Sequence, residues 1–180
     1  MLDVLHYPKP LLVTDAAVNV YPTLLEKRDI VRNAIELAHA LGIAQPRVAI
    51  LSAVETINPQ LRSTLDAAAL CKMAERGQIE GALIDGPLAL DDAISPEAAR
   101  IKEIHSQVAG NGDILLVPDL EAGNLLVKQL LFLAGADCAG IALGARVPIV
   151  LNSRADSVRN RVASIALGVL LTHHRQGVKP

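Results

Sequence analysis

Residues 113–135, DILLVPDLEAGNLLVKQLLFLAG, hold the pattern that decides the fold. An apolar run of strand length over 113–119 is followed, after a turn, by a strongly apolar segment of helical length. A strand that is apolar at consecutive positions is typical of a sheet buried on both faces. The stretch therefore predicts a βα unit, and the carboxyl end of such a strand is where open α/β proteins place ligands.

The alternation of strand and helix extends toward the N-terminus. We predict a strand followed by a turn over 10–18, a strand over 47–53, and helices over 26–41 and 58–77. Gly42 is well placed to end the first helix. Asn58-Pro59 provides an N-cap and a first-turn proline for the second helix.

Toward the C-terminus the pattern continues in shorter elements. We predict a short strand within 80–94 that breaks at Asp85-Gly86-Pro87, and then a helical segment from Ser95 towards Ile104. One or two extended segments follow over 139–153, with a buried strand at 148–153. A last helix covers about 156–173. Alternating strands and helices imply βαβ units and a mainly parallel sheet. The predicted fold class is α/β, and the pattern does not give the strand order.

Composition agrees with this fold. Hydrophobic residues make up 51% of the 180 residues, but aromatic residues only 2%. The core is therefore built from Ala, Val, Leu and Ile, as in sheets covered by helices. The length suits one domain, or one domain and a fragment of another, and no repeat or Gly/Ser linker marks a flexible boundary.

Charge and cysteine content argue against several classes of protein. The 17 basic and 19 acidic residues give a formal net charge of -2, which predicts no attraction to nucleic acid or to an anionic membrane. No apolar run reaches membrane-spanning length, and the N-terminus lacks the pattern of a signal peptide. Cys71 and Cys138 stand singly, so we expect reduced cysteines and a cytoplasmic protein.

Common cofactor and metal motifs are missing from the sequence. It has no G-x-G-x-x-G after a strand, no G-x-x-x-x-G-K-[ST] and no H-E-x-x-H, which disfavours dinucleotide and Walker-type sites. Asp85, Asp91 and Asp92 raise the question of a metal, but no histidine or further carboxylate completes a recognisable spacing. We interpret them as solvated carboxylates and turn residues, and we predict no bound metal.

A hydroxyl and a guanidinium, Ser153-Arg154, lie between the predicted strand at 148–153 and the last helix. At such a junction these groups and free backbone N–H groups can converge on one anion, for which phosphate is the natural guest. The alternative is that Asp156 or Ser157 only caps the helix while Arg154 points into solvent.

The last predicted helix has two different faces. Its apolar stripe, which we expect to be buried, comprises Val158, Val162, Ile165, Ala166 and Val169. A distinct face carries small and polar residues at helical spacing: Ser157, Asn160 or Arg161, Ser164 and Gly168. This polar face either binds an extended ligand or meets water.

The block PDLEAGN at 118–124 follows the strand of the opening stretch. Its glycine permits tight turning, and Asn124 stands at the start of the apolar helix. Asn124 either orients a ligand or caps the helix, and the pattern alone leaves both open.

Five blocks occur together, in an order typical of one family: LLVTDAAVNVYP, RVAILSA, DGPLALDDAI, VPDLEAGNLLVKQL and PIVLNSRADS. By these blocks the chain resembles the phosphate acetyl/butyryltransferase family along nearly its whole length. It looks most like the shorter phosphate butyryltransferase-like branch and the transferase half of bifunctional enoyl-CoA hydratase/phosphate acetyltransferases. The resemblance implies a three-layer, mainly parallel α/β structure with the isocitrate/isopropylmalate dehydrogenase-like fold.

The family's members transfer an acyl group between phosphate and coenzyme A, in a cleft between two α/β domains. The resemblance implies this reaction here, with an acetyl or butyryl group, coenzyme A as substrate, no tightly bound cofactor, no metal and a homodimer. Residues 1–138 resemble the second, inserted domain of the family. Residues 139–180 resemble the strand and helix that return to the first domain, most of which is missing.

The resemblance also implies roles for particular residues. Arg154 and Ser153 are the expected catalytic residues, with Arg154 binding the phosphoryl oxygens and Ser153 bonding the same group or the thiol. Asn124 is expected to orient a polar group of the substrate. Ser157 and Asn160 are further candidate contacts to the acyl phosphate or coenzyme A.

The resemblance does not assign a residue as the general base that takes the thiol proton. The family's acetyltransferases tend to carry, at the position of Asn160, an aspartate thought to take the thiol proton, and an amide cannot do so. Asp156 is the nearest remaining carboxylate, one turn earlier.

Two other functions compete with the transferase. The first alternative is that the chain alone is a non-catalytic module that dimerises or binds coenzyme A, because half of the family's site is missing. Metal-dependent dehydrogenases of the same fold are the second alternative, against which the missing metal carboxylates and cofactor signature argue.

Overall fold

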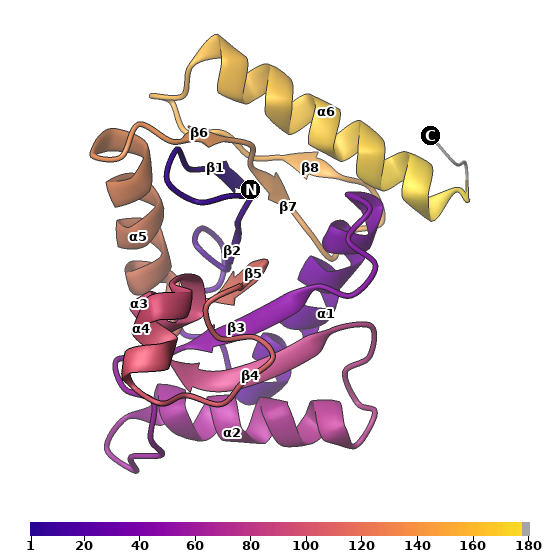
Figure 1. The fold of residues 1–180 in the computed structure, drawn as a ribbon. Helices are drawn as coiled ribbons and strands as arrows, with labels where there is room; N and C mark the ends of the chain where they lie inside the picture. Colours follow the sequence, from indigo (N-terminus) through magenta and orange to yellow (C-terminus); the bar gives the residue numbers. More distant parts are fainter. Residues whose placement is uncertain (178–180) are drawn as a thin grey trace.

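The computed structural model describes residues 1–177, and a four-stranded parallel sheet lies at its centre (Figure 1). The strands, in the order in which they pair, are β2 (Leu12–Thr14), β5 (Ile114–Leu116), β3 (Arg47–Leu51) and β4 (Leu83–Leu88). The parallel pairing confirms the predicted α/β class. The strand order, which the sequence pattern left open, puts β5 and β3 in the middle.

Helices cover both faces of this sheet. They are α1 (Leu24–Ala40), α2 (Arg62–Glu75), α3 (Leu90–Ile94), α4 (Pro96–Ile101), α5 (Leu120–Phe132) and α6 (Val158–Arg175). Val48 and Ile50 of β3 pack in one core cluster with residues of α1, α2 and α6. Ala49 and Leu51 point the other way, into a second cluster with residues of α3 and α5. The result is three layers with the strands buried between helices.

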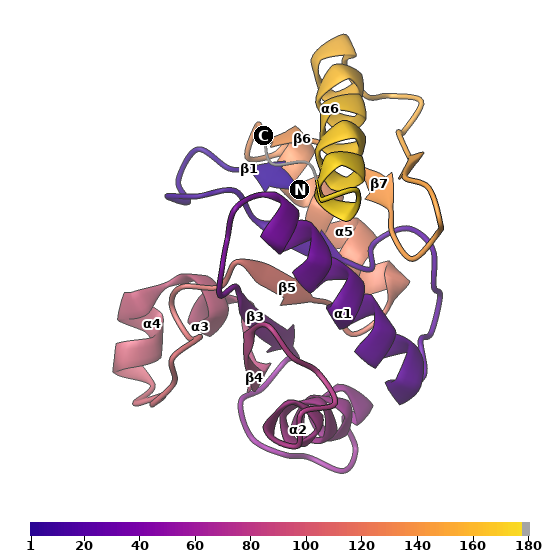
Figure 2. The ribbon, with the colours of Figure 1, turned by 90° about the vertical axis from the view of Figure 1, so that its right-hand side faces the viewer.

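Two short antiparallel ribbons adjoin the main sheet. β1 (Leu2–Asp3) pairs with β6 (Asp137–Cys138), and β7 (Ile141–Ala142) pairs with β8 (Ile149–Val150). α6 lies across these ribbons and beside α1 (Figures 1 and 2). The extended segments predicted over 139–153 therefore exist, but they form a ribbon of their own.

Two element boundaries differ from the prediction. β4 does not break at residues 85–87 but continues through them, with a register shift opposite Ala49 and Leu51 of β3. Gly86 makes this possible, because a Cβ there would lie 2.7 Å from the carbonyl oxygen of Ile50. α2 begins at Arg62 rather than at Asn58, whose side chain instead closes a turn by accepting from the backbone N–H of Gln60.

α6 faces the opposite way from the prediction. Its expected buried stripe is exposed, with Val158 at 79% and Ile165 at 56% of their full exposure. The small and polar face is the buried one: Asn160, Ser164, Leu167, Gly168 and Leu171. β8, predicted to be buried, is exposed as well.

Backbone groups of the ribbons explain this orientation. The N–H of Gly140 donates to Ser164 Oγ at 2.9 Å, and the N–H of Cys138 donates to Asn160 Oδ1 at 3.2 Å. Polar side chains on α6 thus bond strand-end N–H groups that would otherwise be buried without a partner. At Gly168 the helix lies close to β8, since a Cβ there would lie 3.4 Å from Pro148 Cβ and 3.9 Å from Val150 Cγ2.

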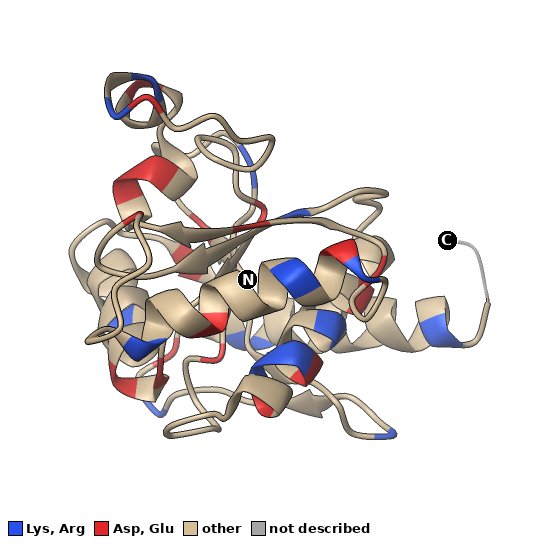
Figure 3. Cartoon of the chain, turned by 90° about the horizontal axis from the view of Figure 1, so that it is seen from below, with Lys and Arg blue, Asp and Glu red and all other residues tan. Residues whose placement is uncertain are grey.

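Charged residues of both signs are interspersed over the helices that Figure 3 shows from below. Among the described residues, none of the helices combines the length and the apolar character needed to cross a membrane.

Candidate functional site

A cleft of about 490 Å³ opens beside the carboxyl end of β2. One wall consists of the loop after β2, residues 15–19, and of α5. The other wall consists of residues 138–143 and of the turn that leads from β8 toward α6. The cleft thus lies where parallel sheets characteristically bind ligands.

Asn124 lines this cleft from the second turn of α5. It does not cap the helix, because Asp119 is the N-cap and its side chain accepts from the N–H of Ala122. Gly123 does not form a turn either. It lies inside the helix, where a Cβ would be 2.7 Å from Val117 Cγ2 and 3.0 Å from the carbonyl oxygen of Asp15. The glycine therefore lets α5 pack directly on the loop after β2.

That loop is held by one carboxylate. Asp15 accepts hydrogen bonds from the backbone N–H groups of Ala17, Val18 and Asn19 and from the side-chain amide of Asn19. Asp15 and Asn19 both line the cleft. Neither residue is among the candidates predicted from the sequence, although the polar break after the apolar run PLLV is a signal for them.

Ser153 lines the same cleft from the opposite wall. Its backbone N–H donates to Asp156 Oδ2 at 2.7 Å, and the side-chain amide of Asn152 donates to the same oxygen at 3.1 Å. Asp156 itself lines the cleft. The structure therefore brings Asn124, Ser153 and Asp156 to one cleft, and a carboxylate fixes the turn that carries Ser153.

Arg154 lies next to the cleft rather than in it. Its side chain is exposed, and within residues 1–177 its guanidinium forms no hydrogen bond or ion pair. Its carbonyl oxygen accepts from Arg161 Nη2 at 3.3 Å. Both arginines line an open hollow that adjoins Ser153, together with Asn152 and Ile165. Two guanidinium groups are thus within reach of an anion at the mouth of the cleft.

Two candidate contacts have structural partners instead. Ser157 is the N-cap of α6 and accepts from the N–H of Asn160 at 3.1 Å, as the capping alternative supposed. Asn160 is buried and bonded to the N–H of Cys138. Neither residue lines the cleft, and the N–H of Ser153 is already bonded to Asp156.

A cysteine and a lysine complete the polar lining of the cleft. Burial, and then the negative charge of Asp156, raise the pKa of the Cys138 thiol, so this sulfur is held in its protonated form and is a poor nucleophile. Lys128 lies one turn after Asn124 on α5 and lines the same wall. The spacing of four residues was the sequence signal that would have selected Lys128.

Comparisons with known proteins agree on one family. A family model described as Phosphate acetyl/butaryl transferase matches residues 4–169. The chain is 60% identical over 179 residues to a phosphate acetyltransferase of Rhizobium meliloti, covering 99% of this chain and 57% of the relative. It is 50% identical over 169 residues to a probable phosphate butyryltransferase of Bacillus subtilis, covering 94% of this chain and 56% of the relative.

A solved structure gives the same assignment. A branched-chain phosphotransacylase from Enterococcus faecalis superposes with a TM-score of 0.88 at 36% identity, over 97% of this chain and 62% of that chain. The protein therefore belongs to the phosphate acetyl/butyryltransferase family, as the sequence resemblance predicted. It spans little more than half the length of the curated relatives described above.

Proposed function

We propose that this chain forms part of an enzyme that moves an acetyl or butyryl group between phosphate and coenzyme A. The observation that carries this proposal is the single cleft lined by both Asn124 and Ser153, in a member of a family of phosphate acyltransferases. Coenzyme A and an acyl phosphate are then its substrates, with no tightly bound cofactor.

The reaction needs a nucleophilic sulfur and a stabilised leaving group. The thiol of coenzyme A gives up its proton, its sulfur bonds to the acyl carbonyl carbon, and the bond from that carbon to the phosphate oxygen breaks. The proton leaves with the phosphate as hydrogen phosphate. Arg154 offsets the charge on the departing phosphate, and Ser153 donates a hydrogen bond to it. Asn124 orients the substrate from the facing wall.

Asp156 acts as a positioning residue in this proposal. Its carboxylate holds the N–H of Ser153 and the amide of Asn152, which sets the direction of the Ser153 side chain. Asn160 takes no part in proton transfer, because it is buried away from the cleft and carries an amide. Its bond to Cys138 supports a structural role for this residue.

The exposed apolar face of α6 supports a two-part enzyme. We infer that residues 1–138 form the inserted domain of the family and residues 139–180 the strand and helix of its other domain. The R. meliloti relative extends well beyond the matched region, since this chain covers 57% of it. The remaining part packs against Val158, Val162 and Ile165, which monomeric domains rarely leave together in water.

The alternative function is a module that binds coenzyme A or dimerises without catalysis. The same exposed face favours it, because a second copy would also cover these side chains. We propose a homodimeric, cytoplasmic protein that binds no nucleic acid and no membrane, in keeping with its balanced charge.

Thioester formation tests the proposal. The purified chain is incubated with coenzyme A and acetyl or butyryl phosphate, alone and with the part of the R. meliloti relative that this chain does not match. We expect absorbance of the thioester to rise when that part is present. Coenzyme A binding without turnover in either mixture would favour the non-catalytic module, and no binding at all would contradict both functions.

A further inference from the structure

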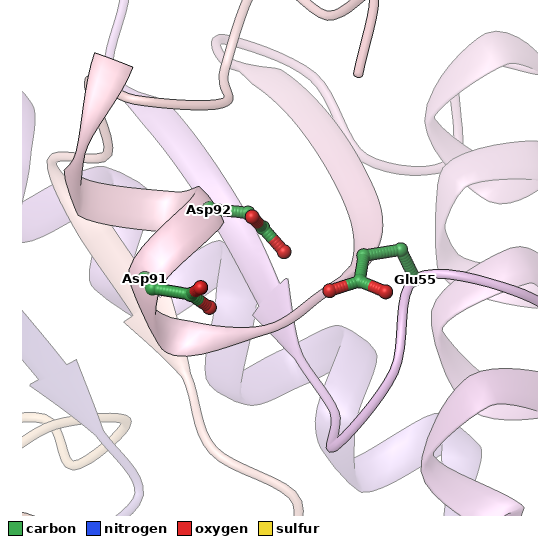
Figure 4. A group of neighbouring side chains, drawn as sticks. All are labelled: Glu55, Asp91 and Asp92. Carbon is green, nitrogen blue, oxygen red and sulfur yellow. The ribbon is translucent and has the colours of Figure 1, made fainter. Parts of the chain in front are cut away.

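Three carboxylates meet outside the cleft, in the segments that follow β3 and β4. Asp91 and Asp92 lie in α3, and Glu55 lies in the connection between β3 and α2 (Figure 4). One oxygen from each residue lies within 4.8 Å of the others. From the sequence, Asp91 and Asp92 are expected to be solvated, with no further carboxylate to complete a metal site. Glu55, distant in sequence, supplies that carboxylate.

A lysine occupies the middle of this acidic cluster. Lys102 Nζ, from the end of α4, lies 2.8 Å from Glu55 Oε1, 3.0 Å from Asp91 Oδ2 and 3.1 Å from Asp92 Oδ2. Three carboxylates and one ammonium leave two formal negative charges without a counter-charge in the cluster. The cluster therefore keeps a net negative charge, because one lysine does not balance three carboxylates, and this charge attracts a further cation.

Asp92 provides an independent observation. It is fully buried, at 0% exposure, and its carboxylate points toward Glu55 in Figure 4. Its Oδ1 has no hydrogen-bond partner within residues 1–177. A buried carboxylate oxygen without a partner is costly, so its presence calls for a proton or a cation that bonds it.

We propose that Glu55, Asp91 and Asp92 bind a hard divalent cation such as Ca²⁺, and that the Lys102 ammonium is the internal cation that the metal displaces. Carboxylate oxygens are the ligands of hard cations, and the cluster has no nitrogen or sulfur ligand besides the lysine. The site is separate from the cleft of the proposed function and does not depend on it.

The oxygens lie close enough together for one ion. Ca²⁺ binds oxygen at about 2.3–2.6 Å, so oxygens on opposite sides of it lie up to about 5 Å apart. The oxygens here lie within 4.8 Å of one another, so one Ca²⁺ can reach all three, and water completes its coordination.

Lys102 is placed to leave when the metal enters. Its side chain is 39% exposed, while the side chain of Asp92 beneath it is 0% exposed, so the ammonium can move into water. The metal then joins the β3–α2 connection to α3 in place of the lysine. Ion binding is expected to stabilise this corner of the fold.

Calorimetric titration with CaCl₂ tests the site. We expect the wild-type chain to bind one Ca²⁺ and its melting temperature to rise with calcium concentration. Glu55→Gln should weaken binding about tenfold, and Lys102→Met should tighten it by a similar factor, the effect of one charge a few ångströms from the ion. Glu97→Gln, an exposed carboxylate on α4 outside the cluster, is the matched control and should bind as wild type.

Three results would overturn the proposal: no calcium binding at millimolar concentration, equal affinity in Glu55→Gln and Glu97→Gln, or no gain in Lys102→Met. Lys102→Met leaves three carboxylates without a partner and can fail to fold. Glu55→Gln removes a half-exposed side chain and should fold, so its loss of binding tests the site independently.

Discussion

Asp156 fixes the turn at Ser153: its Oδ2 accepts the Ser153 backbone N–H at 2.7 Å. The same oxygen accepts the amide of Asn152, which also donates to Ser164 Oγ of α6 at 3.0 Å. The carboxylate lies just before the N-terminus of α6, where the helix dipole favours a negative charge. The turn and the buried face of the helix are thus one bonded unit, and the position of Ser153 depends on both.

Replacing Asp156 should therefore weaken substrate binding through Ser153. Asp156→Ala removes an acceptor from two donors, and we expect it to lower the free energy of unfolding by about 1–3 kcal/mol. When this chain is assayed together with the part of the R. meliloti relative that it does not match, we expect KM for the acyl phosphate to rise more than kcat falls. Asp156→Asn keeps an acceptor oxygen and should restore most of KM. An Asn variant as impaired as the Ala variant would show that charge, rather than geometry, is required.

Arg154 should matter for acyl transfer and little for stability. Its guanidinium is exposed and without a partner among residues 1–177, so Arg154→Ala should change the free energy of unfolding by less than about 0.5 kcal/mol. The rate of thioester formation should fall by about 10²–10³, as for other groups that stabilise charge in a transition state. The matched control is Arg159→Ala, which removes an exposed arginine paired with Asp137. Equal rates in the two variants would remove Arg154 from the site.

The central sheet could be predicted from the sequence because its signal is local. Apolar residues run continuously through 48–51 and 114–116, and a buried strand requires nothing more distant than its own side chains. Asn124 and Ser153 could each be selected for the same reason, since both follow apolar runs. Their meeting in one cleft was implied by the family resemblance rather than by either motif.

The orientation of α6 could not be predicted from its periodicity. An apolar stripe normally faces the core, but here Asn160 and Ser164 bond backbone groups of residues 138–140, which the helix pattern does not reveal. The acidic cluster was missed for a similar reason. Glu55 and Asp91 lie on different connections, and only the packing of α3 beside β3 brings them together.

The two glycines inside helices should respond oppositely to alanine. At Gly123 a Cβ would lie 2.7 Å from Val117 Cγ2 and 3.0 Å from Ala16 Cα, so Gly123→Ala should destabilise by about 1–3 kcal/mol through overpacking. At Gly168 the nearest atom would be Pro148 Cβ at 3.4 Å, so alanine fits and should stabilise by about 0.5–1 kcal/mol through helix propensity. Urea denaturation measures both. A stabilised Gly123→Ala would show that α5 does not pack closely on residues 15–16.

A buried ion pair joins α1 to α2. Lys27 Nζ lies 2.9 Å from Asp66 Oδ2, and both side chains are nearly inaccessible to water. Lys27→Met should destabilise by about 3–5 kcal/mol, because it leaves a buried carboxylate without its main partner. Lys27→Met with Asp66→Leu should recover most of that loss. Lys72→Met breaks an exposed pair with Glu75 and serves as the control, with an expected change of about 0.5 kcal/mol or less.

The apolar face of α6 should be needed for assembly and not for folding. Ile165 is 56% exposed, so Ile165→Glu should leave the melting temperature of the isolated chain almost unchanged. The same variant should lose both its complex with the missing part of the R. meliloti relative and the thioester formation that this complex supports, because the interface would bury an unpaired carboxylate. Glu121→Gln, an exposed change on α5, is the control and should assemble normally. Size-exclusion chromatography with light scattering distinguishes the outcomes. If the variant still forms the complex, the partner binds another face of this chain. If the variant only loses a homodimer, a second copy of this chain covers α6.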